Sequence, residues 1–344
     1  MRQAISQEII DLPKVLLHDH IDGGLRPQTI IELASQINLP LPSHEAGAFQ
    51  ELIYEACNQG SLEKYLKNFD YTIAVMQTEN NLIRIARECV LDLAADGIHY
   101  AEVRGAPELF TRHGLSMRNV VEATLEGLRQ GMQEAKNLGL SITTNLIICA
   151  MRQNNLSLEA AQLALEFREK GVVGFDIAGP EYGFPARNHL PAFELLQRKS
   201  FPFTIHAGES DSFASILEAI NLCGASRIGH GIRIMDEIDI SQDQAVLSDA
   251  SKAIRDQQIH LEMSPTSNLQ TGNIKDYNSH PAGVLIELGF NVALNTDNRL
   301  MSATSLSREY KVMQDAHNWD LNQINIMNTN ALRAAFSGET AFTS

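Results

Sequence analysis

The sequence predicts a (β/α)₈ barrel, an α/β fold in which eight parallel strands form a closed core and helices cover it. Eight short apolar runs occur along the chain, and amphipathic stretches with helical spacing lie between them. The runs are almost continuously apolar, which is typical of parallel strands buried on both faces. From the third run on, successive runs start roughly 25 to 35 residues apart, as expected for one strand-and-helix repeat.

The predicted strands and helices alternate in one direction along the chain. The eight predicted strands cover residues 14–20, 99–104, 141–149, 172–178, 201–206, 227–230, 259–263 and 291–296. The predicted helices between them include residues 117–138, 157–170, 212–222, 243–258 and 281–288. This order favours a parallel barrel over a sheet of antiparallel hairpins.

Two segments extend the simple repeat. About 80 residues separate the first and second strands, and they include helical patterns at 29–36 and 62–69. Because this insertion follows a strand, we expect its helices at the C-terminal mouth of the barrel, where they can cover a pocket. Residues 305–344 are predicted to form C-terminal helices that pack on the barrel.

The chain is predicted to form one domain over residues 1–344. No linker rich in proline, glycine or serine divides it, and no internal repeat or low-complexity segment is visible. Barrels of this class often exceed about 250 residues as a single unit, so the length does not require a second domain.

Composition and charge exclude several classes of function. The net charge is −15 and basic residues form no run, which argues against binding to nucleic acid or anionic membranes. No apolar run approaches the roughly 18 residues of a membrane span, and the N-terminus has no signal-peptide pattern. The four cysteines lack CxxC spacing and are interpreted as reduced thiols. We therefore expect a cytoplasmic protein whose partners are small molecules; its oligomeric state is not predicted.

His18 and His20 form a pair at the end of the first predicted strand. Residues two apart on a strand point to the same side, so both imidazoles can reach one metal ion inside the barrel mouth. An isolated pair of this kind also arises by chance, with one histidine exposed. The pair gains weight because it ends an apolar strand and is followed by Asp22-Gly23-Gly24.

Other polar residues also follow predicted strands, and each of them has an ordinary explanation when taken alone. His206 can be a core histidine, Glu209 a surface carboxylate, His230 a turn histidine between two glycines, and Asp297 a helix N-cap. All of them, however, fall at or just beyond C-terminal strand ends, the rim where catalytic groups lie in this fold. Their joint occurrence with the histidine pair predicts an active site.

The residue types favour a single zinc ion. Histidine nitrogens with one carboxylate suit Zn²⁺, and such a set leaves a position for a water whose pKa falls toward about 7. Dinuclear relatives of this fold use a lysine bridge at the end of the fourth or fifth strand. The fourth strand here ends in Asp176-Ile177-Ala178-Gly179 without a lysine, so one metal per subunit is expected.

A series of segments along most of the chain resembles the adenosine deaminase family of the metal-dependent amidohydrolase superfamily. The His18-Asp19-His20 pattern alone suggests only the superfamily. The specific segments are His206-Ala207-Gly208-Glu209, Gly229-His230-Gly231, Ser264-Pro265-Thr266-Ser267-Asn268 and Asn295-Thr296-Asp297. The matching segments also include Leu12-Pro13-Lys14, Tyr100-Ala101-Glu102-Val103-Arg104 and Gly174-Phe175-Asp176-Ile177-Ala178-Gly179.

This resemblance implies hydrolytic deamination of adenosine and 2′-deoxyadenosine by a zinc-activated water that attacks C6 of the purine. The implied zinc ligands are His18, His20, His206 and Asp297. Glu209 would protonate ring nitrogen N1, and general acids contribute roughly 10²–10⁴-fold to such a step. His230 would orient and polarise the attacking water. The Cys-ligated signature of the base deaminases is absent.

The resemblance also implies the substrate contacts. Asp22 would bind the ribose 5′-hydroxyl, the Gly179 backbone would face N3, and His20 would border the substrate. The better-known family pattern has a second aspartate after the metal-binding one, where this chain has Asn298. An amide donates without a prior proton, so we expect Asn298 to bind N7.

Two further departures concern the pocket wall. Pro180 replaces an aspartate common in relatives, removes a backbone N–H and favours an extended Gly179. Gly105-Ala106 replaces bulkier residues. These changes leave open deamination of adenine or of another 6-aminopurine nucleoside. A barrel amide or ester hydrolase and a non-catalytic binding protein are weaker alternatives, because Glu209 and all four ligands are present.

Overall fold

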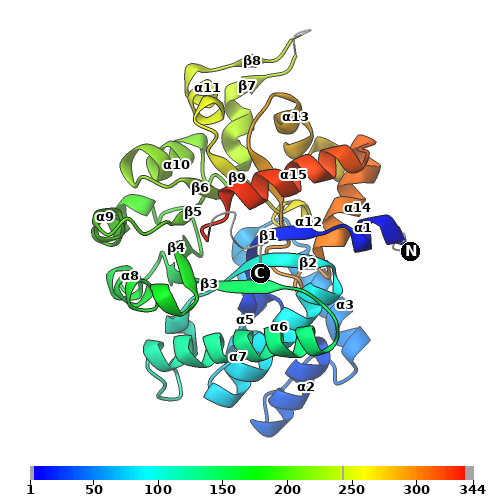
Figure 1. Ribbon diagram of the computed structural model, residues 1–344, viewed down its shortest axis with the longest axis vertical. Coiled ribbons are helices and arrows are strands. Elements are labelled where there is room, and N and C mark those ends of the chain that lie inside the picture. The colour runs from blue at the N-terminus through cyan, green and yellow to red at the C-terminus, as the bar shows by residue number, and fades with distance from the viewer. Residues whose placement is uncertain (1–3, 242–243, 338–344) are drawn as a thin grey trace.

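The core of the computed structural model, which describes residues 4–241 and 244–337, is a closed barrel of eight parallel strands (Figure 1). The strands pair in the orders β1-β2-β3-β4 and β10-β9-β6-β5. Two bridges, Asp19 to Asp297 and Phe175 to Phe203, join these two sheets into one barrel. The predicted fold class is confirmed.

The strand positions agree with the apolar runs of the sequence. The strands are β1 (Lys14–His20), β2 (Ile98–Gly105), β3 (Thr143–Met151), β4 (Val172–Ala178), β5 (Thr204–Ala207), β6 (Arg227–His230), β9 (His260–Met263) and β10 (Val292–Leu294). The fifth strand begins later than predicted, after Pro202, which has no N–H for a strand ladder.

The barrel closes at the first and last strands, and this seam builds the candidate site. The His20 N–H donates to the Asp297 carbonyl at 2.7 Å, and the Asp297 N–H donates to the His18 carbonyl at 3.0 Å. Residues at the two ends of the fold thus lie side by side because the backbone pairs here.

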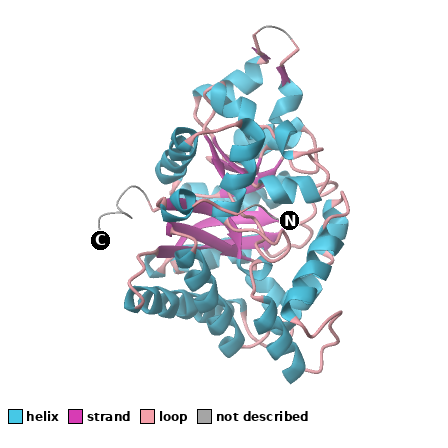
Figure 2. Cartoon of the chain, turned by 90° about the vertical axis from the view of Figure 1, so that its right-hand side faces the viewer, coloured by secondary structure: helices cyan, strands magenta, loops and turns pink. Residues whose placement is uncertain are grey.

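Helices cover the barrel on its outside (Figure 2). Those that follow strands two to eight of the barrel are α7 (Met117–Asn137), α8 (Ser157–Glu166), α9 (Leu190–Arg198), α10 (Phe213–Leu217), α11 (Asp249–Asp256), α12 (Pro265–Gln270), α13 (Ala282–Glu287), α14 (Leu306–His317) and α15 (Leu321–Ala334). A short helix, α1 (Gln7–Asp11), precedes β1. Residues 338–344 of the predicted C-terminal helical segment lie outside the described residues.

The insertion after β1 is helical, as predicted. It contains α2 (Pro27–Gln36), α3 (Ala46–Cys57), α4 (Leu62–Leu66), α5 (Phe69–Val75) and α6 (Glu79–Ala95). Side chains of α4 and α5 line the pocket at the C-terminal ends of the strands. The insertion therefore covers the mouth of the barrel.

One predicted helix is wrong in its first part. The segment predicted as 243–258 contains β8 (Val246–Leu247), which pairs antiparallel with β7 (Ile238–Asp239). The helix α11 starts only after Ser248, whose side chain caps it by accepting from the Ser251 N–H. Asp243 itself lies outside the described residues.

Charged side chains form a network inside the barrel below the site. The Arg104 guanidinium donates to Asp176 at 2.7 Å and to Glu262 at 2.8 Å, and Arg227 donates to Glu262 at 2.6 Å. All four side chains are buried. Such pairing is required for buried charges.

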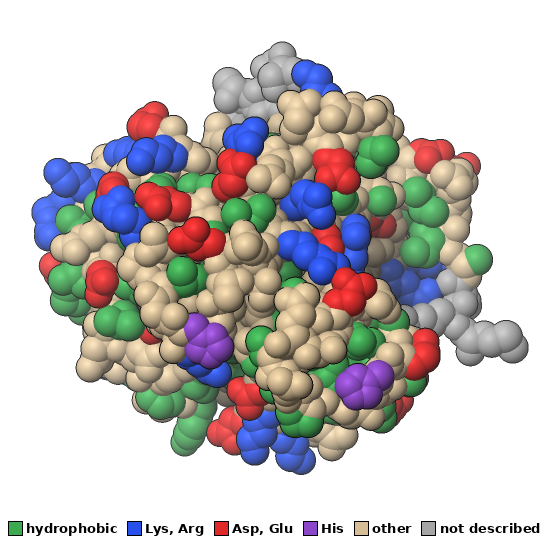
Figure 3. Space-filling view, turned by 90° about the horizontal axis from the view of Figure 1, so that it is seen from below, with side chains coloured by type: hydrophobic (Ala, Val, Ile, Leu, Met, Phe, Trp, Pro, Cys, Tyr) green, Lys and Arg blue, Asp and Glu red, His purple; other side chains and the backbone are tan. Residues whose placement is uncertain are grey.

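Acidic and basic side chains are interspersed over the face seen in Figure 3. Among the described residues, no helix is long and apolar enough to cross a bilayer.

Candidate active site

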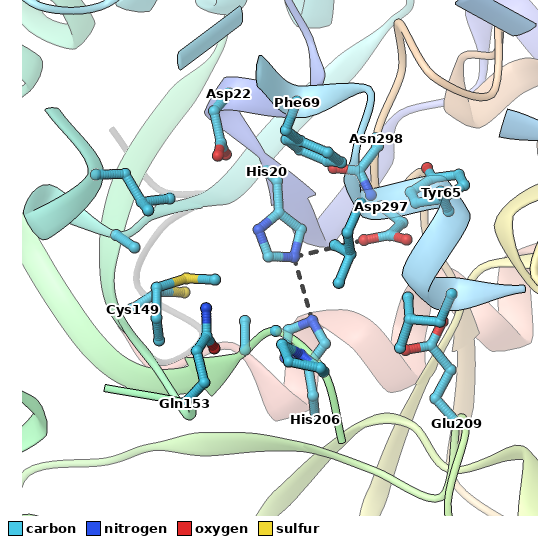
Figure 4. A pocket seen from close by; sticks show the side chains of 18 of the residues that line it. His20, Asp22, Tyr65, Phe69, Cys149, Gln153, His206, Glu209, Asp297 and Asn298 are labelled. Carbon is cyan, nitrogen blue, oxygen red and sulfur yellow. Dashed lines mark hydrogen bonds and ion pairs between the residues drawn. The ribbon is translucent and has the colours of Figure 1, made fainter. Parts of the chain in front are cut away.

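Four side chains converge at the C-terminal rim of the barrel, and Figure 4 labels three of them, His20, His206 and Asp297. One ligand atom from each of the four lies within 4.8 Å of the others; the fourth residue is His18. His20 Nε2 lies 3.1 Å from His206 Nε2 and 3.4 Å from Asp297 Oδ1. These are the four residues that the sequence resemblance assigned to a metal.

Buried carboxylates orient two of these rings. His18 Nδ1 lies 3.0 Å from Glu262 Oε2, and His206 Nδ1 lies 3.0 Å from Asp176 Oδ2. Each carboxylate accepts a hydrogen bond from Nδ1–H, which leaves the Nε2 lone pair facing the cluster. Arg104 donates to both carboxylates and so couples the two rings.

Asp297 is also held from outside the cluster. The Ser267 hydroxyl donates to Asp297 Oδ2 at 2.6 Å, so Oδ1 remains turned toward His18 and His20. The backbone φ of Asp297 is 55°, a left-handed conformation that residues other than glycine rarely adopt. Strain of this kind concentrates at functional sites.

The cluster fits a metal ion. His18 Nε2 is buried and has no hydrogen-bond partner among the described residues, although Asp297 Oδ1 is 3.2 Å away. Burial lowers the pKa of His20 and His206, and neutral imidazoles are the form that binds metal. Three nitrogens and one oxygen therefore face a common point, where only the His20–His206 pair makes a hydrogen bond, at 3.1 Å.

His230 and Glu209 lie beside the cluster. His230 Nε2 is 3.6 Å from Glu209 Oε2, and the His230 ring centroid lies 5.0 Å from that of His18. Burial raises the pKa of the Glu209 carboxyl well above its usual range, and the charge of Asp297 acts in the same direction. A carboxyl that is protonated at neutral pH can serve as a general acid.

Glu181 holds the loop that carries Glu209. Its carboxylate accepts hydrogen bonds from four consecutive backbone N–H groups, those of Gly208, Glu209, Ser210 and Asp211, at 2.6 to 3.0 Å. The Ser215 hydroxyl donates to the same carboxylate at 2.6 Å. Glu181 was not singled out from the sequence, because a carboxylate after β4 has no distinctive local pattern.

We expect Glu181→Gln to destabilise the protein and to displace Glu209. The amide would turn an NH₂ group toward backbone donors, at a cost of about 3 kcal/mol. Thermal unfolding should show a lower Tm, and kcat should fall at least about 10-fold while metal content stays unchanged. Glu169→Gln, at a side chain that is 90% exposed, is the control. An unaltered Tm and kcat in Glu181→Gln would contradict this role.

A cavity of about 210 Å³ adjoins the cluster and contains the predicted substrate contacts. Asp22, Gly179, Asn298 and His20 all line it. Asp22 and Glu209 lie on opposite sides of His20 (Figure 4). Gly179 has a φ of 104°, so it is not in the extended conformation expected before Pro180, because the turn after β4 requires a positive φ.

Several wall residues were not identified from the sequence. They are Leu62, Tyr65, Leu66, Phe69 and Ile73 from α4 and α5, and Cys149, Met151 and Gln153 at the end of β3. Tyr65 is 1% exposed and its hydroxyl has no hydrogen-bond partner among the described residues. Only the helical periodicity of 62–69 indicated that this segment packs against the barrel.

The fold and the cluster at its C-terminal rim define a metal-dependent hydrolase of the barrel type. Comparison with known proteins refines this class. The sequence profile of the family described as adenosine deaminase matches residues 13–341. The chain belongs to this family, and it is a hydrolytic deaminase.

Individual relatives agree with the family assignment. The adenosine deaminase 1 of Streptomyces coelicolor is 48% identical over 326 residues, which cover 94% of this chain and 82% of the relative. The adenosine deaminase of Mycolicibacterium vanbaalenii is also 48% identical, with 94% and 90% covered. The crystal structure of an Arabidopsis N6-mAMP deaminase matches with a TM-score of 0.83 and 26% identity, and covers 98% of both chains.

Proposed function

We propose that this protein deaminates adenosine and 2′-deoxyadenosine to inosine and 2′-deoxyinosine, with release of ammonia. The observation that carries the proposal is one pocket that is lined both by members of the four-residue cluster (His20, His206 and Asp297) and by Glu209, a buried carboxyl of raised pKa. The adenosine deaminases of similar sequence support the same substrate.

The metal is proposed to be one zinc ion per subunit. Its ligands are His18, His20, His206 and Asp297, and three nitrogens with one oxygen suit zinc. When bound, zinc supplies a water activated for attack near neutral pH. Metal analysis of the purified active protein tests both the identity and the one-to-one ratio.

Glu209 and His230 are the proposed catalytic residues. Attack on C6 moves electrons onto N1, so a proton donated by Glu209 to N1 removes the developing charge. His230 lies next to Glu209 and to the His18 ring, where its side chain can orient the attacking water. Side chains of α4 and α5 form part of the pocket wall.

The Asp22 carboxyl, the Asn298 amide and the Gly179 backbone N–H are proposed to bind the nucleoside. Asp22 Oδ1 is buried and has no hydrogen-bond partner among the described residues. Asp22 is assigned to the ribose 5′-hydroxyl, the Gly179 N–H to N3, and the Asn298 NH₂ group, which can donate, to N7. The opposite placement of Asp22 and Glu209 suits the ribose and N1 ends of the substrate.

Other attributes belong to the same proposal. The substrate is a small purine, because the cavity of about 210 Å³ cannot hold a polymer. We place the protein in the cytoplasm, since all four cysteines are free and buried. We assign residues 1–344 to one domain, because Asp19 and Asp297 pair across the barrel seam.

The absorbance change of adenosine, together with ammonia release, tests the function. Metal-loaded protein should convert adenosine and 2′-deoxyadenosine with higher kcat/KM than adenine or N6-methyl-AMP. If adenine is turned over preferentially, the proposed nucleoside substrate is wrong, whereas the proposed deamination reaction still holds. Failure of every 6-aminopurine with a fully loaded metal site would overturn the proposal.

Asn298 gives a separate prediction about N7. Asn298→Ala should lower kcat/KM for adenosine by about 1–3 kcal/mol, because N7 loses its donor. With 7-deazaadenosine, which has no acceptor at this position, the wild type should lose a similar amount and the variant should lose nothing further. Equal losses for both enzymes on the deaza substrate would show that Asn298 does not contact N7.

A further inference from the structure

His230 presents one ring nitrogen to the site and the other to the protein. Its Nε2 faces Glu209 Oε2 at 3.6 Å, while its Nδ1 lies 3.1 Å from Asn268 Nδ2. A neutral imidazole carries its proton on one nitrogen only, so the partner of Nδ1 decides what Nε2 can do. Asn268 follows β9, at the fourth position of α12.

The orientation of the Asn268 amide follows from a backbone contact. The Ser264 N–H lies 3.2 Å from Asn268 Oδ1. A backbone N–H can only donate, so the amide atom that faces it is the oxygen. The opposite amide atom is therefore the NH₂ group, and it donates to the lone pair of His230 Nδ1. Both Asn268 and His230 are at most 1% exposed.

A second buried histidine supports the same orientation. The Ala282 N–H donates to His280 Nδ1 at 3.1 Å, so His280 Nδ1 carries a lone pair. Its proton is then on Nε2, which lies 3.3 Å from Asn268 Oδ1 and donates to it. His280 is 1% exposed and precedes α13. Two donors thus hold Asn268 Oδ1 away from His230.

We propose that Asn268 and His280 are positioning residues that fix His230 as the Nε2–H tautomer. The hydrogen bonds run in one direction, from the Ala282 backbone through His280 and Asn268 to His230 Nδ1. His230 therefore donates a hydrogen bond from Nε2 to the attacking water and has no lone pair there to accept a proton. The tautomer assignment follows from the hydrogen bonds alone; only its effect on the attacking water rests on the proposed deamination.

Histidine ¹⁵N NMR on the full, zinc-loaded chain tests the tautomer directly. The His230 and His280 signals, identified by their loss in His230→Gln and His280→Gln, should each show a protonated Nε2 and an unprotonated Nδ1. A protonated Nδ1 on His230 overturns the proposal. This readout needs no substrate, so it holds or fails independently of adenosine turnover.

Asn268→Asp replaces the amide that donates to His230 Nδ1 by a carboxylate of nearly the same shape, which can only accept. A carboxylate cannot donate to Nδ1, so His230 should switch to the Nδ1–H tautomer. We expect kcat to fall about 10²-fold, with a much smaller change in KM, because a water-orienting donor is lost. An unchanged His230 tautomer in folded Asn268→Asp overturns the proposal. If this variant does not fold, the wild-type spectrum decides alone.

Substitutions of His280 separate positioning from packing. His280→Gln retains an amide donor for Asn268 and should keep the His230 tautomer and most of kcat. His280→Phe removes the donor and should give a mixture of His230 tautomers with a lower kcat. His260→Phe is the matched control, because His260 is also 1% exposed but contacts Asn291 at the opposite rim. Equal kcat losses in the two Phe variants, without a tautomer change, would contradict the role.

Discussion

Asp297→Ala is expected to abolish metal binding and, with it, deamination. Asp297 provides the only carboxylate oxygen of the four-residue cluster, and without it three adjacent neutral imidazoles must hold a divalent cation alone. Loss of a residue that merely supports a ligand costs about 10- to 100-fold in metal affinity, and loss of a ligand should exceed this. Metal content after dialysis and kcat with adenosine measure the effect.

Ser267→Ala provides a graded comparison for this prediction. It removes the hydroxyl that donates to Asp297 Oδ2 at 2.6 Å but leaves the carboxylate in place. We expect an affinity loss within about 10- to 100-fold, and recovery of activity when excess zinc is added. If Asp297→Ala retains full metal occupancy and activity, the assignment of the cluster as a metal site is wrong.

Glu209→Gln is expected to lower kcat by about 10²–10⁴-fold with little effect on KM or metal content. The amide has nearly the shape of the protonated carboxyl, so substrate still binds, but it cannot transfer a proton to N1. Burial raises the pKa of Glu209 well above its usual range, so the substitution replaces a carboxyl that favours the neutral form by a neutral amide. Thermal stability should therefore be preserved.

The comparison variant for Glu209→Gln is Asp236→Asn, an exposed carboxylate beyond β6. It should retain wild-type kcat, KM and Tm. Steady-state kinetics with adenosine, followed by absorbance, measure both variants. A near-normal kcat in Glu209→Gln would show that Glu209 does not donate the proton and that another group in the pocket does.

Much of the fold was predictable because parallel barrel strands have a strong local pattern. Strand β6 matches its predicted range, and the insertion at 62–69 covers the mouth as expected. The hairpin of β7 and β8 was missed because two-residue strands give no periodicity. The start of α11 was predicted wrongly because Ser248, which caps this helix, lies among several other polar residues that could also cap a helix.

The sequence by itself determined the barrel and the residues at its rim, because continuous apolar strands that end in histidine or aspartate are local features. The contacts that orient those residues were decided only by the tertiary structure. His18 and Glu262 are 244 positions apart, and His230 and Asn268 are 38 apart. No local sequence pattern indicates such partners. His18 approaches Glu262 when the barrel closes between Asp19 and Asp297, and His230 approaches Asn268 because β6 pairs with β9.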